Sequence, residues 1–292
     1  MKKLKVNLHL IEACNYRCRH CFAHFDKHNV LGKDKWQAII DNTVKSGMVS
    51  SFNFAGGEPL LYPHLTSLAE YAHSLGCDCS VITNGSCINE DWIKNNAHLF
   101  STIGFSLDSF SPGTLRKIGR CDASGRVLDL DRIKEIFTLI KAYNPSVKIK
   151  VNTVVSAVNK DENLGELIKK HELPVDRWKI LRMAKFENEC FSNADITITD
   201  DEYTAYISRN LASFGIAAET DNVLYRTDNG MEIVCEINLN GTYIMIDAGG
   251  YLVDDTKNSS YVRIIDCTET PFAEGLDKLT FKSDIYEARY QK

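Results

Sequence analysis

The sequence predicts an α/β fold built around a parallel sheet, and three features support this prediction. Strand-like and helix-like segments alternate along the first 185 residues, six strand-like segments fall within that stretch, and turn signals such as Asn84-Gly85 separate them. Repeated βα units favour parallel strands joined by right-handed crossovers. After residue 186 the pattern changes to short strands between Gly- and Asn-rich turns, which we interpret as a C-terminal extension.

Hydrophobic periodicity locates the elements in order. The first segment alternates apolar and polar residues, as a strand does, whereas Trp36, Ile39 and Ile40 recur at helical spacing in the next. The predicted strands are 5–11, 51–55, 79–83, 102–107, 147–155 and 177–183, and the predicted helices between them are 33–46, 65–75, 90–97, 130–142 and 162–171. The extension is expected to hold a helix at 200–214 and strands at 232–237 and 242–246. We therefore expect a main unit at 1–185 and an extension at 186–292 that belongs to the same structural unit.

Composition excludes several classes of protein. The 292 residues are 44% hydrophobic and 25% charged, as in an ordinary globular domain. The net charge of −5 provides no basic field, so we expect no nucleic-acid partner. No apolar run is long enough to span a membrane, and the first residues lead into a strand without a signal-peptide pattern. The ten cysteines then fit a reduced, cytoplasmic compartment.

Three cysteines after the first predicted strand carry the strongest chemical signal. Cys14, Cys18 and Cys21 have the spacing C-x3-C-x2-C. A cubane iron–sulfur cluster normally takes four thiolates, so three leave one iron with an open coordination position. A closed zinc site, in which His20 or His24 is the fourth ligand, is the structural alternative.

A glycine-rich turn follows the second predicted strand. In Gly56-Gly57-Glu58-Pro59 the two glycines allow the backbone to approach a ligand closely, although a tight turn alone would also explain them. Both motifs fall at carboxyl ends of strands, where α/β barrels carry their chemistry. Together they resemble the radical S-adenosylmethionine (SAM) superfamily. The resemblance implies a [4Fe-4S] cluster held by the three cysteines, and SAM bound at its open iron with the turn near the SAM amino group.

Further segments resemble the viperin family within that superfamily. They are Cys14-Asn15-Tyr16-Arg17-Cys18, Asn53-Phe54-Ala55-Gly56-Gly57-Glu58-Pro59, Thr83-Asn84-Gly85-Ser86, Ser106-Leu107-Asp108-Ser109-Phe110, Ile118-Gly119-Arg120, Lys150-Val151-Asn152-Thr153-Val154, Arg177-Trp178-Lys179 and Tyr243-Ile244-Met245-Ile246-Asp247. The resemblance covers residues 5 to 255, and implies a partial (βα)6 radical SAM barrel with a C-terminal extension closing the barrel. This chain lacks the N-terminal amphipathic membrane helix of animal viperins, so we expect a prokaryotic-type member with no membrane partner.

The viperin resemblance also implies an activity. Members convert a nucleoside triphosphate to its 3′-deoxy-3′,4′-didehydro analogue, a chain terminator that serves antiviral defence. The 5′-deoxyadenosyl radical removes the C4′ hydrogen, and the 3′-hydroxyl leaves as water. The expected partners are CTP, UTP or GTP, among which the sequence does not choose, and a reductant such as flavodoxin or ferredoxin.

Residue roles carry over by position. The cofactor-binding residues implied by the resemblance are Gly56, Gly57, Glu58, Asn84, Ser106 and Arg120. Tyr243 matches the position proposed to donate hydrogen late in the reaction, although a packed core tyrosine is the simpler interpretation. His24 and Lys27 match a polar loop only loosely. The family's C-terminal Lys-Arg-Gly-Gly segment has no clear counterpart, and residues 281–283 and 289–290 are weak candidates for it.

Two basic strands predict a phosphate site. A two-residue period puts Lys150 and Asn152 on one face of the strand at 147–155, and Arg177 and Lys179 on one face of the strand at 177–183. If their apolar faces pack against helices, these four residues point into the barrel. Buried cations are costly unless paired, and a triphosphate would pair them. The reversed arrangement, with solvated charges, is the alternative.

Two other functions remain open from sequence. A radical SAM peptide maturase or activating enzyme would share both motifs, but many maturases carry further cluster cysteines, and Cys190, Cys235 and Cys267 are isolated here. A non-enzymatic iron–sulfur sensor or electron carrier would leave the glycine turn and the basic face unexplained.

Overall fold

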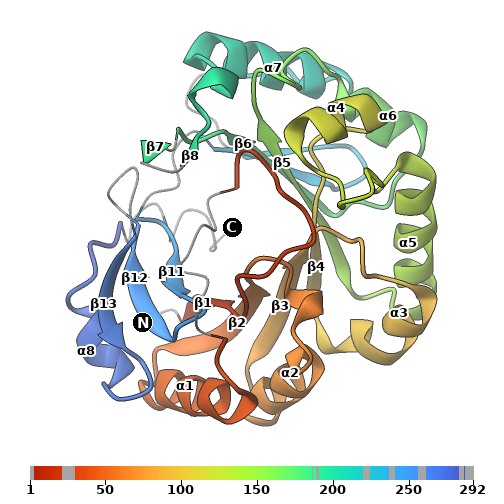
Figure 1. Ribbon diagram of the computed structural model, residues 1–292. Coiled ribbons are helices and arrows are strands. Elements are labelled where there is room, and N and C mark those ends of the chain that lie inside the picture. The colour runs from red at the N-terminus through yellow and green to blue at the C-terminus, as the bar shows by residue number, and fades with distance from the viewer. Residues whose placement is uncertain are drawn as a thin grey trace.

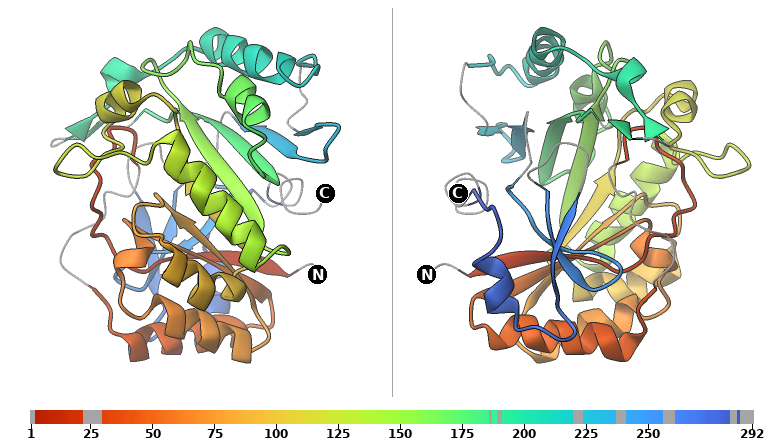
Figure 2. Two further views of the ribbon diagram at one scale, coloured as in Figure 1. Left: turned by 90° about the vertical axis from the view of Figure 1, so that its right-hand side faces the viewer. Right: turned by 60° about the vertical axis from the view of Figure 1, so that its left-hand side comes forward.

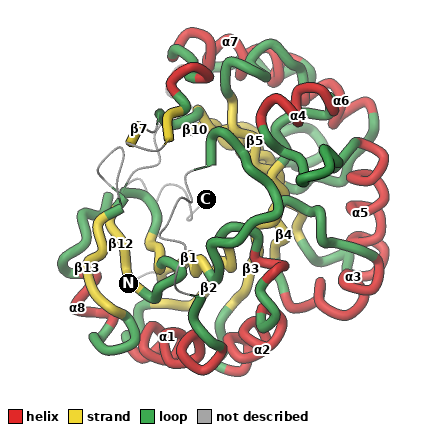
Figure 3. Tube along the Cα trace, viewed as in Figure 1, coloured by secondary structure: helices red, strands yellow, loops and turns green. Residues whose placement is uncertain are grey.

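The computed structural model describes residues 3–21, 30–185, 187–188, 191–219, 224–236, 241–255, 261–282 and 286. These residues form one curved sheet of eleven strands with helices along its outer side, and a separate two-stranded hairpin (Figures 1 and 3). No helix within these ranges is long and apolar enough to cross a membrane.

Six parallel strands form the centre of the sheet in chain order. They are β1 (Leu4–His9), β2 (Val49–Ala55), β3 (Asp78–Thr83), β4 (Thr102–Ser106), β5 (Lys148–Val155) and β6 (Arg177–Arg182). Each pairs in parallel with the next. The six strands predicted from the sequence are confirmed, because alternation and turn residues are local signals that the sheet preserves.

Helices connect these strands on the outer side of the sheet (Figure 3). The predicted ones are α1 (Lys33–Lys45), α2 (Leu65–Ser74), α3 (Glu90–Asn96), α5 (Leu130–Tyr143) and α6 (Leu164–Lys170), and short 3₁₀ helices lie at Pro59–Leu61, Ala97–Leu99 and Ala194–Ile196. One helix, α4 (Pro112–Ile118), was not predicted. Ser111 caps its start, with its Oγ accepting from the amide of Thr114 at 3.3 Å, and Gly119 ends it at φ 84°.

The chain after residue 186 adds strands at both edges of the sheet. β10 (Glu232–Glu236) pairs in parallel with β6, and β11 (Ile244–Ile246) pairs in parallel with β1. β9 (Leu224–Arg226), β12 (Tyr251–Asp254) and β13 (Val262–Asp266) continue the two edges in antiparallel fashion. The remaining elements of this part are the hairpin of β7 (Glu187–Asn188) and β8 (Phe191–Ser192), and the helices α7 (Asp200–Ala212) and α8 (Phe272–Leu276).

This arrangement corrects one detail of the predicted fold. The partial (βα)6 barrel is present, but the two outermost strands, β9 and β13, do not pair with each other in the part of the chain that is described. The antiparallel strands turn back along their own edge, so the extension lengthens the barrel wall and leaves it open instead of closing it. The proposed division at residue 185 stays a prediction.

The two faces of β5 and β6 differ sharply. Ile149 and Val151 are fully buried and belong to the same apolar core as Ile136 and Phe137 of α5. Trp178 is also fully buried, and its Nε1 donates to the Thr153 hydroxyl at 2.9 Å. The alternate residues, Lys150 and Asn152 on β5 and Arg177 and Lys179 on β6, therefore lie on the inner face, and the register pairs Lys150 with Arg177 and Asn152 with Lys179.

Replacing Trp178 by alanine tests this packing. The Trp178→Ala variant should lose about 3–5 kcal/mol of unfolding free energy, because the change opens a large cavity behind β6. Val262→Ala on the edge strand β13, where the side chain is 40% exposed, should change stability by only about 0.5 kcal/mol. Chemical denaturation of both apoproteins measures the difference, and equal midpoints would contradict the assigned inner and outer faces.

Candidate active site

The cysteine loop leaves the carboxyl end of β1, at the end of the sheet opposite the N-terminus (Figure 2). Backbone hydrogen bonds hold it on two sides. The amide of Gly57 donates to the carbonyl of Ile11 at 2.6 Å, and the amide of Glu58 donates to the carbonyl of Ala13 at 2.9 Å. On the other side, the amide of Arg19 donates to the carbonyl of Ile118 at the end of α4 at 2.9 Å. The loop is thus clamped between the glycine turn and α4.

Glycine is required at both clamping points. A Cβ at Gly57 would stand 2.3 Å from the carbonyl oxygen of Ala13, and a Cβ at Gly119 would stand 2.2 Å from that of Arg17. Real side chains do not approach backbone oxygens this closely, so any larger residue must displace the loop. In this chain Gly56 and Gly57, predicted to bind the cofactor, also position the cysteines.

The three thiols act on one another. The pKa of the Cys18 thiol is raised to about 12, chiefly by burial; Arg120 opposes this shift, whereas Cys21, Asp108 and Cys14 add to it. A bound metal reverses this balance, because it stabilises thiolates directly. In the described part of the chain no three His, Cys, Asp or Glu side chains are grouped closely enough to hold a metal ion. Three adjacent soft ligands on a clamped loop fit a [4Fe-4S] cluster with one open iron.

The side chain of His20 contacts Arg120 and Asp108, which does not favour it as a fourth metal ligand. Its Nε2 lies 3.2 Å from Nη2 of Arg120 and 3.4 Å from Oδ2 of Asp108, and burial lowers its pKa to about 4. The ring is therefore neutral and oriented by this pair. His24 and Lys27 lie outside the described residues.

Arg120 is anchored by a buried carboxylate. Its Nε donates to Oδ2 of Asp108 at 2.5 Å, and the amide of Val154 donates to Oδ1 at 2.7 Å. Burial alone would raise the pKa of Asp108, but the charges of Arg120 and His20 hold it below its ordinary value. Within the described ranges Nη1 of Arg120 has no protein partner. An oriented guanidinium with a spare edge suits a carboxylate such as that of SAM.

The other predicted cofactor residues have different environments. Glu58 is fully buried, and its carboxylate accepts from the Thr83 hydroxyl at 2.6 Å and from the amide of Asn84 at 2.7 Å, so it ties the glycine turn to the end of β3. The side chain of Asn84 donates to Oδ1 of Asn15 at 2.9 Å, beside the cysteine loop. Ser106 ends β4 half-buried, and its hydroxyl has no partner among the residues that the structure describes.

The predicted phosphate residues come together on the inner face. Lys179 forms an ion pair with Glu236 at 2.7 Å and donates to the hydroxyl of Tyr243 at 2.8 Å. Arg177 lies 3.7 Å from a carboxylate oxygen of Glu232 on β10. Lys150 makes no ion pair in the described part of the chain, and burial, followed by the charges of Lys179 and Arg177, lowers its pKa well below the ordinary value.

An uncharged group on the same face also lacks a partner. Oδ1 of Asn152, next to Lys179 in register, is buried without a hydrogen bond among the described residues. Cations that repel one another, beside an amide oxygen that can accept a further hydrogen bond, suit a ligand that carries both negative charge and a hydrogen-bond donor.

Several contacts within the site were not predicted. Asp108, His20 and Glu236 hold the predicted cations in place, but their spacing in the chain gives no sign of these contacts. Asp108 could have been noted, because it lies two residues beyond Ser106 at the end of a strand.

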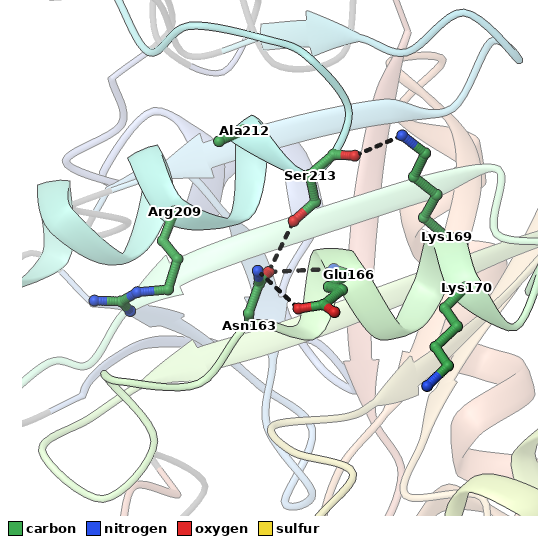
Figure 4. Close-up of a pocket in the computed structure, with 7 residues that line it drawn as sticks. All are labelled: Asn163, Glu166, Lys169, Lys170, Arg209, Ala212 and Ser213. Carbon is green, nitrogen blue, oxygen red and sulfur yellow. Dashed lines mark hydrogen bonds between the residues drawn. The ribbon is translucent and has the colours of Figure 1, made fainter.

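A second hollow lies on the outer surface, between α6 and α7, with a volume of about 550 Å³ (Figure 4). It is lined by Asn163, Glu166, Lys169, Lys170, Arg209, Ala212 and Ser213. Lys169 donates to the carbonyl of Ser213 and Arg209 to that of Lys160, so these two cations serve to join the helices. This groove is part of the outer helical layer, whereas the predicted ligands lie on the inner face.

Comparisons with known proteins identify the family to which this chain is similar. The model of the Radical SAM superfamily matches residues 8–171. The chain is 38% identical over 288 residues to the S-adenosylmethionine-dependent nucleotide dehydratase of Selenomonas ruminantium, covering 98% of both chains. It is 26% identical to the S-adenosylmethionine-dependent nucleotide dehydratase RSAD2 of Oncorhynchus mykiss, covering 90% of this chain and 69% of that protein. The solved structure of anSMEcpe with bound AdoMet superposes with a TM-score of 0.70 at 17% identity, covering 96% of this chain and 84% of that one, which supports the fold.

The glycine clamp generates a prediction for the cluster. Gly57→Ala should weaken cluster retention by about tenfold or more. The added methyl group overlaps the cysteine loop, and displacing the loop costs about 1–3 kcal/mol. Iron and sulfide per chain, measured after anaerobic reconstitution, report this loss. Gly113→Ala is the matched control, since its Cβ would meet nothing closer than 3.8 Å. Full iron content in both variants would show that the turn does not hold the loop.

Proposed function

Because the chain belongs to the radical SAM superfamily, and within it to the SAM-dependent nucleotide dehydratases, we propose that it converts a ribonucleoside triphosphate to its 3′-deoxy-3′,4′-didehydro analogue. The observation that carries the proposal is that one sheet presents both the cysteine loop and a cationic inner face with unpaired lysine and amide groups. A peptide substrate has no need of such a face. The base, among cytosine, uracil and guanine, is left to experiment.

The cofactors define the chemistry that the residues must support. When bound, the [4Fe-4S] cluster and SAM supply a 5′-deoxyadenosyl radical that takes the hydrogen atom from C4′ of the nucleotide. Cys14, Cys18 and Cys21 hold the cluster, and the free edge of Arg120 with the hydroxyl of Ser106 binds the carboxylate end of SAM. Asn84 lies beside the loop on the adenosine side.

The inner face positions the nucleotide. Lys150, Arg177 and Lys179 bind the phosphate groups, and the Asn152 amide accepts a hydrogen bond from the substrate. Holding the nucleotide by its phosphates fixes the distance from C4′ to the SAM site, and this positioning is the protein's main contribution to the rate.

Tyr243 serves the last step. After C4′ loses its hydrogen atom, the C3′–O bond breaks and the hydroxyl leaves with a proton as water. One electron then completes the 3′,4′-double bond. The phenol of Tyr243 supplies both this electron and the proton that leaves in the water, so that it becomes a neutral tyrosyl radical, and Lys179 orients it by donating to its oxygen at 2.8 Å.

The wider role follows from the product. A nucleotide without a 3′-hydroxyl terminates RNA synthesis, so we propose a function in antiviral or anti-phage defence. We also propose that the protein acts in the cytoplasm, where nucleoside triphosphates and a one-electron donor such as flavodoxin or ferredoxin are present.

An anaerobic assay tests the proposal directly. The reconstituted protein receives SAM, dithionite and each nucleoside triphosphate in turn, and mass spectrometry follows 5′-deoxyadenosine and a nucleotide lighter by one water. We expect one triphosphate to stimulate deoxyadenosine formation and to yield the dehydrated product in equal amount. Deoxyadenosine formation that no nucleotide changes would overturn the substrate assignment and favour a peptide maturase.

A conservative substitution tests the role of Tyr243. In Tyr243→Phe the ratio of dehydrated nucleotide to deoxyadenosine should fall by about tenfold or more, a modest share of what proton transfer by a positioned group contributes. SAM cleavage should continue, because the radical forms before this step. Tyr143→Phe on the exposed side of α5 is the control. An unchanged ratio in Tyr243→Phe would assign the late donor to another group.

A further inference from the structure

Lys5 belongs to β1, a strand on the side of the curved sheet that lies opposite β5 and β6 (Figure 1). Its neighbours Val6 and Leu8 are fully buried in the apolar core, so alternation places Lys5 on the other side of the strand. The ammonium reaches across β2 and donates to the hydroxyl of Ser80 on β3 at 3.2 Å. The side chain therefore leans over the sheet in the direction of β4 and β5.

A line of buried polar side chains fixes this position. The Ser80 hydroxyl donates to Oδ1 of Asn53 at 2.9 Å, the Asn53 amide donates to Oδ1 of Asn7 at 2.8 Å, and the Asn7 amide donates to the carbonyl of Ile244 at 3.1 Å. The line spans β3, β2, β1 and β11, and every donor in it has a defined acceptor. Its one charged end is Lys5. A directional network of this kind holds the ammonium in place without neutralising it.

The balance of charge singles out two lysines. Lys179 has Glu236 and Arg177 has Glu232, whereas Lys5 and Lys150 make no ion pair in the described part of the chain. Burial, with Arg177 adding to it, lowers the pKa of Lys5, although Asp78 opposes the shift. Lys5 is among the charges that lower the pKa of Lys150. Two buried ammonium groups that repel each other are unfavourable until an anion binds between them.

We propose that Lys5 is a further substrate-binding residue, which together with Lys150 holds the terminal phosphates of the nucleotide from opposite sides of the inner face. This inference rests on the proposed function. The β- and γ-phosphates carry most of the negative charge of the substrate, and a lysine on each side matches that charge where one strand alone cannot. Lys5 would therefore make the site select triphosphates over monophosphates.

Substitution of Lys5 by methionine tests the proposal. Lys5→Met should lower kcat/KM for the triphosphate by about tenfold or more, as expected on removing a hydrogen bond to a charged group. The loss should be small for the corresponding monophosphate, so the preference for triphosphate should narrow. Lys5→Arg should retain most of the preference for triphosphate, because it keeps the positive charge. Lys170→Met, which removes an exposed lysine from the outer helix α6, should change neither value.

A binding measurement tests the contribution of Lys5 to phosphate affinity independently of catalysis. Inorganic tripolyphosphate is titrated calorimetrically into the anaerobic holoenzyme, and Lys5→Met should bind it about tenfold or more weakly than the unsubstituted protein. The melting temperature of Lys5→Met should be equal or higher, because the substitution removes an unpaired buried charge, so lost affinity would not reflect unfolding.

The outcomes distinguish the two proposals. If the unsubstituted protein dehydrates a nucleotide and Lys5→Met keeps both its triphosphate preference and its affinity for tripolyphosphate, the assignment of Lys5 is wrong while the function stands. If the unsubstituted protein yields no dehydrated nucleotide yet loses tripolyphosphate binding on Lys5→Met, the anion site stands and the proposed reaction is wrong.

Discussion

The site depends on the continuation of strand pairing beyond the ends of β1 and β2. The amide of Leu10 donates to the carbonyl of Ala55 at 3.0 Å, that of Gly57 to the carbonyl of Ile11 at 2.6 Å, and that of Glu58 to the carbonyl of Ala13 at 2.9 Å. The segments that follow β1 and β2 therefore remain hydrogen-bonded to each other beyond the sheet. Such an approach is possible only because Gly57 has no side chain. The buried carboxylate of Glu58 then extends the contact to β3. Three successive strand ends are joined in one network, and the cysteines take their positions from it.

The inner face follows a different principle, since its cations are balanced unequally by carboxylates. Apolar residues of β5 and β6 pack against the helices, which forces the alternate lysine, arginine and asparagine side chains inward. Carboxylates from β10 balance Lys179 and Arg177, whose positions are thereby fixed. Lys150 and Lys5 form no ion pair among the described residues, and an anion bound between them would offset the cost of leaving them unbalanced.

Local patterns predicted what is local in this molecule. The strands and long helices follow from periodicity, and the two faces of β5 and β6 follow from alternation. The helix α4 was overlooked, although Ser111 and Pro112 are a start signal and Gly119 is a stop signal. The ion pair of Arg120 with Asp108 depends on how α4 folds back onto the end of β4, and that of Lys179 with Glu236 depends on β10 joining β6; no spacing in the chain reveals either. Lys5 was overlooked for the same reason, because its partners lie on β3 and β5.

The unequal pairing of the inner cations suits the two tasks proposed for them. A tyrosine that gives up a hydrogen atom stays uncharged overall, so its surroundings should be near neutral, and Glu236 supplies this by balancing the Lys179 ammonium that touches the Tyr243 hydroxyl. A phosphate chain needs the opposite, a surplus of positive charge, and Lys150 and Lys5 provide it from opposite walls. Glu236 on β10 therefore keeps the surroundings of Tyr243 near neutral, while the inner face as a whole keeps the surplus of positive charge that the phosphates need.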